Sequence, residues 1–117
     1  MDYSVLHDGE INMKVCSALG LGLSGYARII RQGDVTILLD DNKTLVDYCN
    51  NPADAWPIIV DNSIGIKKQS NGLWVSSRHG GMYPQYHENP IRAAMIVFLM
   101  MQDSANVPAN STGSDIR

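Results

Sequence analysis

The first regular pattern of apolar and polar positions runs from Asp8 to Leu19. Its apolar residues recur at offsets of four and seven and therefore share one face of a helix: Ile11, Val15 and Ala18. We expect Asp8 to be the N-cap, and Glu10 favours the positive end of the helix dipole. Gly20 suits the left-handed conformation that ends many helices.

Two further helices are predicted by an asparagine followed by a proline. Asparagine can accept from the free amides of a first turn, and proline at the first helical position loses no hydrogen bond. The segment from Asn51 to Val60 begins this way, although Pro57 predicts a kink or a restart within it. The segment that begins at Asn89 is apolar on almost every side from Ile91 to Met101, apart from Arg92. We therefore expect it to form a helix in the centre of the core.

Short runs rich in β-branched residues, separated by polar turns, predict strands. They fall at residues 26–31, 35–39, 44–49, 64–66 and 73–75. Glycine-containing breaks at Gln32-Gly33-Asp34 and Asn71-Gly72 indicate two hairpins. Residues 76–88 are rich in Ser, Gly, Tyr and His, and we interpret them as a long loop.

The order helix, hairpin, short helix, hairpin, buried helix predicts an α+β fold. We expect a small antiparallel sheet of hairpins with two or three helices packed on one face and the C-terminal helix buried. A chain of 117 residues fits one domain, which we place at residues 1–103. Residues 104–117 are poor in apolar side chains, and we expect a disordered tail there.

Composition narrows the classes of function. The formal net charge of −3 gives no global attraction to nucleic acid or anionic lipid. The longest apolar run, from Ala93 to Met101, is about half the length that a membrane span requires. Two cysteines, Cys16 and Cys49, cannot build a disulfide scaffold, and no signal peptide opens the chain. We expect a cytoplasmic protein with reduced, partly buried thiols and no cofactor.

Three motifs with chemical meaning have simpler structural readings. Residues 20–25 fit G-x-G-x-x-G, but a dinucleotide site needs a strand before and a helix after, and the order expected here is reversed. Cys16 and Cys49 lack the surroundings that activate a nucleophilic thiol. The aspartates fall at turns and helix starts, where Asp has structural uses. We therefore assign no catalytic residue.

Two alternatives to a purely structural role stay open. His79 and His87, with Glu88 and Cys49, offer ligands for a small metal-binding protein or hydrolase, although the histidines are eight residues apart and lack the close pairing of a preformed site. The other alternative is a nucleic-acid-associated factor, in recombination or replication, that uses four dispersed basic residues: Arg28, Arg31, Lys67 and Lys68.

Candidate binding residues fall in three places. Trp56 can anchor the core or dock a partner, with Asp54 as a polar rim. The loop at 78–87 combines adaptable glycines with rigid side chains, and its candidates are Arg78, His79, Tyr83, Tyr86 and His87. Arg92 can bind an anionic ligand or pair with a carboxylate such as Asp54, and structural pairing is the favoured reading.

Two blocks carry a resemblance to a known family. They are Tyr48-Cys49-Asn50-Asn51-Pro52-Ala53-Asp54-Ala55-Trp56-Pro57-Ile58-Ile59 and Asn89-Pro90-Ile91-Arg92-Ala93-Ala94-Met95-Ile96-Val97-Phe98-Leu99-Met100-Met101. Together with the opening residues 1–4 and 10–12, they resemble the NinX-type family of small proteins from lambdoid phages and enterobacterial prophages. The resemblance covers about half the chain and implies a phage early region as the genetic setting, with no implied activity, cofactor or catalytic residue.

These observations favour a non-catalytic phage accessory module that binds a host or phage protein. The expected contact surface is the 78–87 loop, together with the region of Trp56. A second copy of the chain is another candidate partner, through an apolar face of the last helix.

Overall fold

The computed structural model describes residues 2–20, 28–29, 35–39 and 43–105. Its elements, in chain order, are η1 (Tyr3–Val5), α1 (Asp8–Ala18), β1 (Arg28–Ile29), β2 (Ile37–Leu38), β3 (Leu45–Val46), α2 (Pro52–Asp61), β4 (Ile64–Lys68), β5 (Trp74–Arg78), β6 (Met82–His87) and α3 (Pro90–Ala105). The predicted first helix, the strands at 35–39 and 44–49, and the last helix are therefore confirmed.

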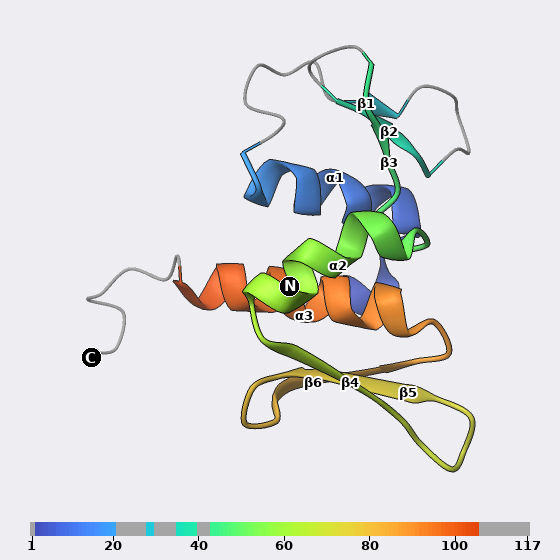
Figure 1. Ribbon diagram of the computed structural model, residues 1–117, viewed down its shortest axis with the longest axis vertical. Coiled ribbons are helices and arrows are strands. Elements are labelled where there is room, and N and C mark those ends of the chain that lie inside the picture. Colours follow the sequence, from blue (N-terminus) through green and yellow to red (C-terminus); the bar gives the residue numbers. More distant parts are fainter. Residues whose placement is uncertain (1, 21–27, 30–34, 40–42, 106–117) are drawn as a thin grey trace.

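Helix α3 lies at the centre of the molecule. The antiparallel sheet β4-β5-β6 covers one side of it, and α1 and α2 cover the other, as Figure 1 shows. A second antiparallel sheet, β1-β2-β3, packs beside α1 at the far end. The α+β class and the buried C-terminal helix are confirmed, and the expected strands divide between two sheets.

The apolar run of α3 is buried because neighbours surround it. All seven residues from Ala93 to Leu99 are buried, and Met95 and Val97 are fully enclosed. Each large side chain removed from water in this way contributes about 1.5–3 kcal/mol. The helix continues to Ala105, past the domain boundary expected at residue 103. Residues 106–117, the rest of the predicted tail, lie outside the described residues.

The start of α1 differs from the prediction by one residue. His7, and not Asp8, is the N-cap: its Nδ1 accepts from the Gly9 amide at 3.0 Å, and Glu10 reaches back to the His7 amide to complete a capping box. A neutral imidazole carries an acceptor nitrogen, so histidine can take the position that Asp was expected to hold. Gly20 has a φ of 78°, as its predicted role at the helix end requires.

Helix α2 is one continuous helix despite Pro57. Asn51 is its N-cap, with Oδ1 accepting from the Ala53 amide at 3.1 Å, and Pro52 occupies the first helical position as predicted. Pro57 is exposed and lies inside the helix. The helix therefore neither breaks nor restarts there.

The interpretation of residues 76–88 as a loop is wrong. β5 and β6 form a hairpin that turns at Gly80 and Gly81, both of which have positive φ. β6 is an edge strand, so Pro84 costs no ladder hydrogen bond toward a further strand, and a register shift beside Tyr83 (φ 57°) bends it. One face of β6 is only partly buried against α3, so the strand needs few aliphatic residues. For that reason it was not recognised as a strand from the sequence.

The hairpin turn offers a local test of this correction. Gly80→Ala and Gly81→Ala are each expected to lower the free energy of unfolding by about 1–2 kcal/mol, because L-residues are strained at positive φ. A Cβ at either position meets nothing within 4 Å, so the cost comes from the backbone alone. Gly65→Ala in β4, whose Cβ would make only ordinary contact, is the matched control. Urea unfolding that shows equal stability for all three variants would contradict the turn.

Candidate functional site

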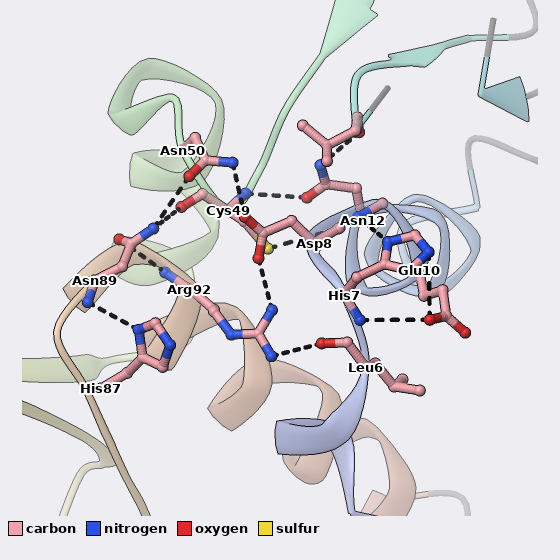
Figure 2. A network of polar contacts seen from close by, with 12 residues as sticks. Leu6, His7, Asp8, Glu10, Asn12, Cys49, Asn50, His87, Asn89 and Arg92 are labelled. Atoms are coloured by element: carbon pink, nitrogen blue, oxygen red, sulfur yellow. Dashed lines mark hydrogen bonds and ion pairs between the residues drawn. The ribbon is translucent and has the colours of Figure 1, made fainter. Parts of the chain in front are cut away.

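A buried arginine, Arg92, lies in the first turn of α3. It is 7% exposed and donates from Nη1 to Asp8 Oδ1 at 2.6 Å. Its Nη2 donates to the backbone oxygens of Leu6 at 2.6 Å and Ser4 at 3.2 Å. Figure 2 shows how this side chain reaches from α3 to the segment before α1. One cation therefore fastens the N-terminal segment onto the central helix.

The partner of Arg92 is Asp8, and not the Asp54 considered from the sequence. Burial alone raises the pKa of the Asp8 carboxyl, but hydrogen bonds from Asn50 and Arg92 outweigh burial, and the pKa lies below its usual 3.8. Asp54 instead accepts from the Asp47 amide at 2.9 Å and holds the start of α2 against the preceding turn. The structural pairing expected of Arg92 is thus present with a different carboxylate.

Asn89 joins three segments at the start of α3. Its Oδ1 accepts from the amides of Ile91 at 3.0 Å and Arg92 at 3.3 Å, as an N-cap does. Its Nδ2 donates to the Cys49 carbonyl at 2.9 Å, and its own backbone amide donates to His87 Nδ1 at 2.9 Å. The predicted capping role is confirmed, and the side chain also links α3 to the turn before α2 (Figure 2).

Asn12 is the fully buried polar residue of α1. Its Nδ2 donates to the Val35 carbonyl and to Asp47 Oδ1, both at 2.8 Å, and its Oδ1 accepts from the Cys49 amide at 3.0 Å. Neither Asn12 nor Asp8 was recognised from the sequence as part of a polar centre. The signal available was an asparagine directly after Ile11 of the apolar stripe, which by itself indicates nothing specific.

A pocket of about 360 Å³ opens beside this network, between the starts of α1 and α3. It is lined by Leu6, His7, Asp8, Val35, His87, Asn89 and Arg92. Two of the residues singled out from the sequence, His87 and Arg92, therefore come together, although they were considered for different roles.

Both cysteines are free, as expected, and they are fully buried where partial burial was predicted. Burial raises the pKa of the Cys49 thiol well above its ordinary value, and the nearby Asp8 charge adds to the rise. The thiol contacts the Asp8 carbonyl at 3.9 Å. A protonated and enclosed thiol is a poor nucleophile, so Cys49 packs as a small apolar side chain.

The set of residues considered for a metal is not assembled. His79 lies in the turn after β5, whereas His87 ends β6, at the opposite end of that strand. Cys49 is enclosed in the core, and Glu88 is exposed. Across the described ranges, no three His, Cys, Asp or Glu side chains come close enough together to hold a metal ion.

The β5–β6 hairpin places the residues that were expected in one interaction loop on different faces of the sheet. Tyr83 is partly buried and packs against the core, and Arg78 is exposed near the same turn. Tyr86 is 56% exposed and pairs across the sheet with Val75, on the face away from α3. Tyr83 and Tyr86 therefore do not form one surface.

The most exposed large aromatic side chain in the described residues is Trp56, at 60%. The favoured reading of Trp56 as a core anchor is therefore wrong: the buried residues of α2 are Ala55, Ile58 and Ile59. The opposite face of α2 is apolar as well, and its exposed residues follow the helical spacing 0, 3, 4, 7: Ala53, Trp56, Pro57 and Val60. This spacing was visible in the sequence, but the two faces could not be told apart there.

The basic residues considered for nucleic acid lie on different sheets. Arg28 belongs to β1, and Lys67 and Lys68 belong to β4 at the other end of the molecule (Figure 1). The Lys68 ammonium lies 5.2 Å from the centroid of the Trp74 ring. Arg31 is outside the described residues, as is most of the glycine-rich stretch 20–25. No helix in the described part of the chain has the length and apolar character that crossing a bilayer requires.

Comparison with known proteins gives one match. The family model described as Bacteriophage P22, NinX matches residues 2–102, a range that contains the exposed face of α2 and the Asp8–Arg92 pair. Searches of the curated proteins and of the solved structures gave no match. The resemblance carried by the two sequence blocks is thereby confirmed over nearly all the described chain. The protein belongs to the bacteriophage NinX family and is a phage accessory protein.

Proposed function

We propose that this protein is a non-catalytic module that binds a host or phage protein through the exposed face of α2, defined by Ala53, Trp56, Pro57 and Val60. The observation that carries the proposal is the exposure of Trp56 at 60% and Val60 at 55% on one helical face. Exposed apolar stripes that include tryptophan are typical of sites where partners dock. The buried face of α2, formed by Ala55, Ile58 and Ile59, holds the helix on the core, and the exposed face lies opposite it.

The charges around the face indicate the chemistry of the partner. Helix α2 carries two acidic residues, Asp54 and Asp61, and no lysine or arginine. A protein that offers an apolar pocket for Trp56, with basic side chains at its rim, complements this surface. Basic rim charges would chiefly increase the rate of association and its sensitivity to salt.

The test is a comparison of matched surface variants. Trp56→Ser and Val60→Ser should fold as the wild type does, because both side chains are exposed. Truncating a central aromatic contact commonly costs about 2 kcal/mol or more, so affinity for the partner should fall about 30-fold. Tyr86→Ser, on the outer face of β6, removes an equally exposed aromatic residue and should bind normally.

The experiment is capture by the tagged variants from phage-infected and uninfected cells, with a nuclease-treated arm, followed by affinity measurement on the captured protein. A partner that resists nuclease, binds the Tyr86 variant and is lost with Trp56→Ser supports the proposal. Loss with Tyr86→Ser alone would place the contact on the sheet. Light scattering that shows a wild-type dimer and a monomeric Trp56→Ser variant would identify a second copy as the occupant and contradict a heterologous partner.

The geometry gives the alternative functions less support. A metal-dependent hydrolase would need His79 and His87 near each other, and β6 separates them. Nucleic-acid binding by Arg28, Lys67 and Lys68 would need one basic face, and these residues belong to separate sheets.

A further inference from the structure

The turn between β4 and β5 contains the only Asn-Gly pair of the chain, Asn71-Gly72. The backbone nitrogen of the residue after an asparagine can attack the carbonyl carbon of the asparagine side chain and close a five-membered ring. Glycine in the second position lowers the steric barrier, because it has no Cβ and adopts many backbone conformations. Asn71 and Gly72 are both exposed, so water reaches the reacting atoms.

The turn orients the side chain of Asn71 for this reaction. Its Oδ1 accepts from the Leu73 amide at 3.0 Å, which is an Asx turn. The ring of atoms closed by this bond includes the Gly72 nitrogen, so the side-chain carbonyl is folded back over the neighbouring peptide. The same Leu73 N–H would stabilise the negative charge that Oδ1 acquires when its carbon is attacked. One hydrogen bond therefore supplies both orientation and an oxyanion donor.

Gly72 is only loosely held in the turn. Its φ is 89°, and a Cβ at this position would meet nothing within 4 Å. Its amide donates to the Gln69 carbonyl at 3.3 Å, slightly beyond the usual range for such bonds, whereas the turn is closed by the Gln69 amide and the Leu73 carbonyl at 2.8 Å. The Gly72 bond must break before the nitrogen attacks, and its length makes that step easy.

Comparable pairs elsewhere in the described residues are held in unreactive arrangements. Asp8-Gly9 could close the same ring, but Gly9 is buried in the first turn of α1, where its amide donates to His7 Nδ1 at 3.0 Å. The Asp8 carboxylate is also paired with Arg92. Asn62 is followed by a serine, and its side-chain nitrogen is bonded within α2 at 2.8 Å. The tertiary structure thus leaves the β4–β5 turn as the reactive place.

We propose that Asn71 is a site of spontaneous modification, converted through a succinimide to aspartate and isoaspartate. The Gly72 nitrogen forms a bond to Asn71 Cγ, the Cγ–Nδ2 bond breaks, and Nδ2 leaves as ammonia with the proton that Gly72 loses. Water then adds to one of the two ring carbonyls. Opening the bond between Cγ and the Gly72 nitrogen gives aspartate, and opening the original peptide bond gives isoaspartate. No oxidant, reductant or cofactor is consumed.

The modification changes the tip of the β4–β5 hairpin. Each product carries a carboxylate where Asn71 has an amide, so the formal net charge of −3 becomes one unit more negative. Isoaspartate also inserts a methylene into the backbone, which alters the spacing to Leu73 on which the Asx turn depends. Figure 1 shows this hairpin on the other side of α3 from α2, so the site is independent of the proposed protein-binding function.

The test is prolonged incubation of the folded full chain at mildly alkaline pH, followed by trypsin digestion and mass spectrometry. The tryptic peptide 69–78 contains Asn71 as its only asparagine. It should progressively gain the mass difference between an amide and a carboxylic acid, and an isoaspartate-specific methyltransferase should label it. The peptides 1–14 and 44–67, which contain Asp8-Gly9 and Asn62, should change far more slowly. Equal conversion of all three peptides would overturn the proposal.

Two controls test the role of the turn and the identity of the residue. The free peptide of residues 69–78 has the same sequence without the turn, and the folded chain should convert at least as fast. If the peptide converts while the folded chain does not, the turn protects Asn71 and the proposal is wrong. Asn71→Ser can keep the bond to the Leu73 amide through its hydroxyl, but it has no amide to lose. A mass gain that persists in this variant would belong to Gln69 and would also contradict the proposal.

Discussion

Replacing Arg92 with methionine is expected to lower the free energy of unfolding by about 3 kcal/mol. Removing the buried arginine leaves the partly buried Asp8 with only its hydrogen bond from Asn50, which is more costly than replacing both charges. Methionine fills a similar volume but leaves Asp8 and the carbonyls of Leu6 and Ser4 without their donor. The loss is therefore electrostatic and comes with little change in packing. Urea unfolding followed by tryptophan fluorescence measures it.

Arg78→Met is the matched control for this prediction. Arg78 is an exposed arginine at the end of β5, where its side chain contacts Met82, and its replacement should change stability by no more than about 0.5 kcal/mol. The double variant Arg92→Met with Asp8→Leu should recover part of the loss, because it removes both charges. If Arg92→Met were as stable as Arg78→Met, the Asp8–Arg92 pair would not be what holds the N-terminal segment on α3.

Asn12→Leu is expected to cost about 3 kcal/mol. Leucine has the same side-chain branching as asparagine and forms helices more readily, so helix propensity does not explain a loss. What it removes is the set of three hydrogen bonds to the Val35 carbonyl, the Asp47 carboxylate and the Cys49 amide, and the buried Cys49 amide loses its acceptor. Thermal and urea unfolding should both show the effect.

The comparison for this second prediction is Asn71→Ala. Asn71 is exposed in the turn between β4 and β5 and makes one local bond, to the Leu73 amide at 3.0 Å, which water can replace. Its cost should stay below about 1 kcal/mol. If the free energy of unfolding of Asn12→Leu fell by no more than this, α1 would be held by apolar contacts alone.

Asn12 and Arg92 link elements that lie far apart in the sequence. Asn12 ties α1 to the segments that flank β2 and precede α2, and Arg92 ties the residues before α1 to α3. The pocket and the start of α2 both lie next to these links. The pocket lies between the two tied helix starts, and α2 follows directly on the Cys49 turn that Asn12 and Asn89 hold.

Several elements could be predicted from the sequence because their signals are local. The Asn-Pro starts of α2 and α3, the glycine after α1 and the nine-residue apolar run all act within a few residues of the chain. The hairpin at residues 76–88 was missed because it lacks such a local signal. An edge strand with one face half-buried needs no aliphatic run, and its partner strand and α3 supply what the local sequence lacks.

The sequence by itself determined the α+β class, the buried last helix and the family. The tertiary structure alone decided which carboxylate pairs with Arg92, since Asp8 lies 84 residues away and only packing brings it near. It likewise decided which face of α2 is exposed. Both faces of that helix are apolar, so the periodicity of the sequence is compatible with burial of either face. The contact with α3 determines which face is buried.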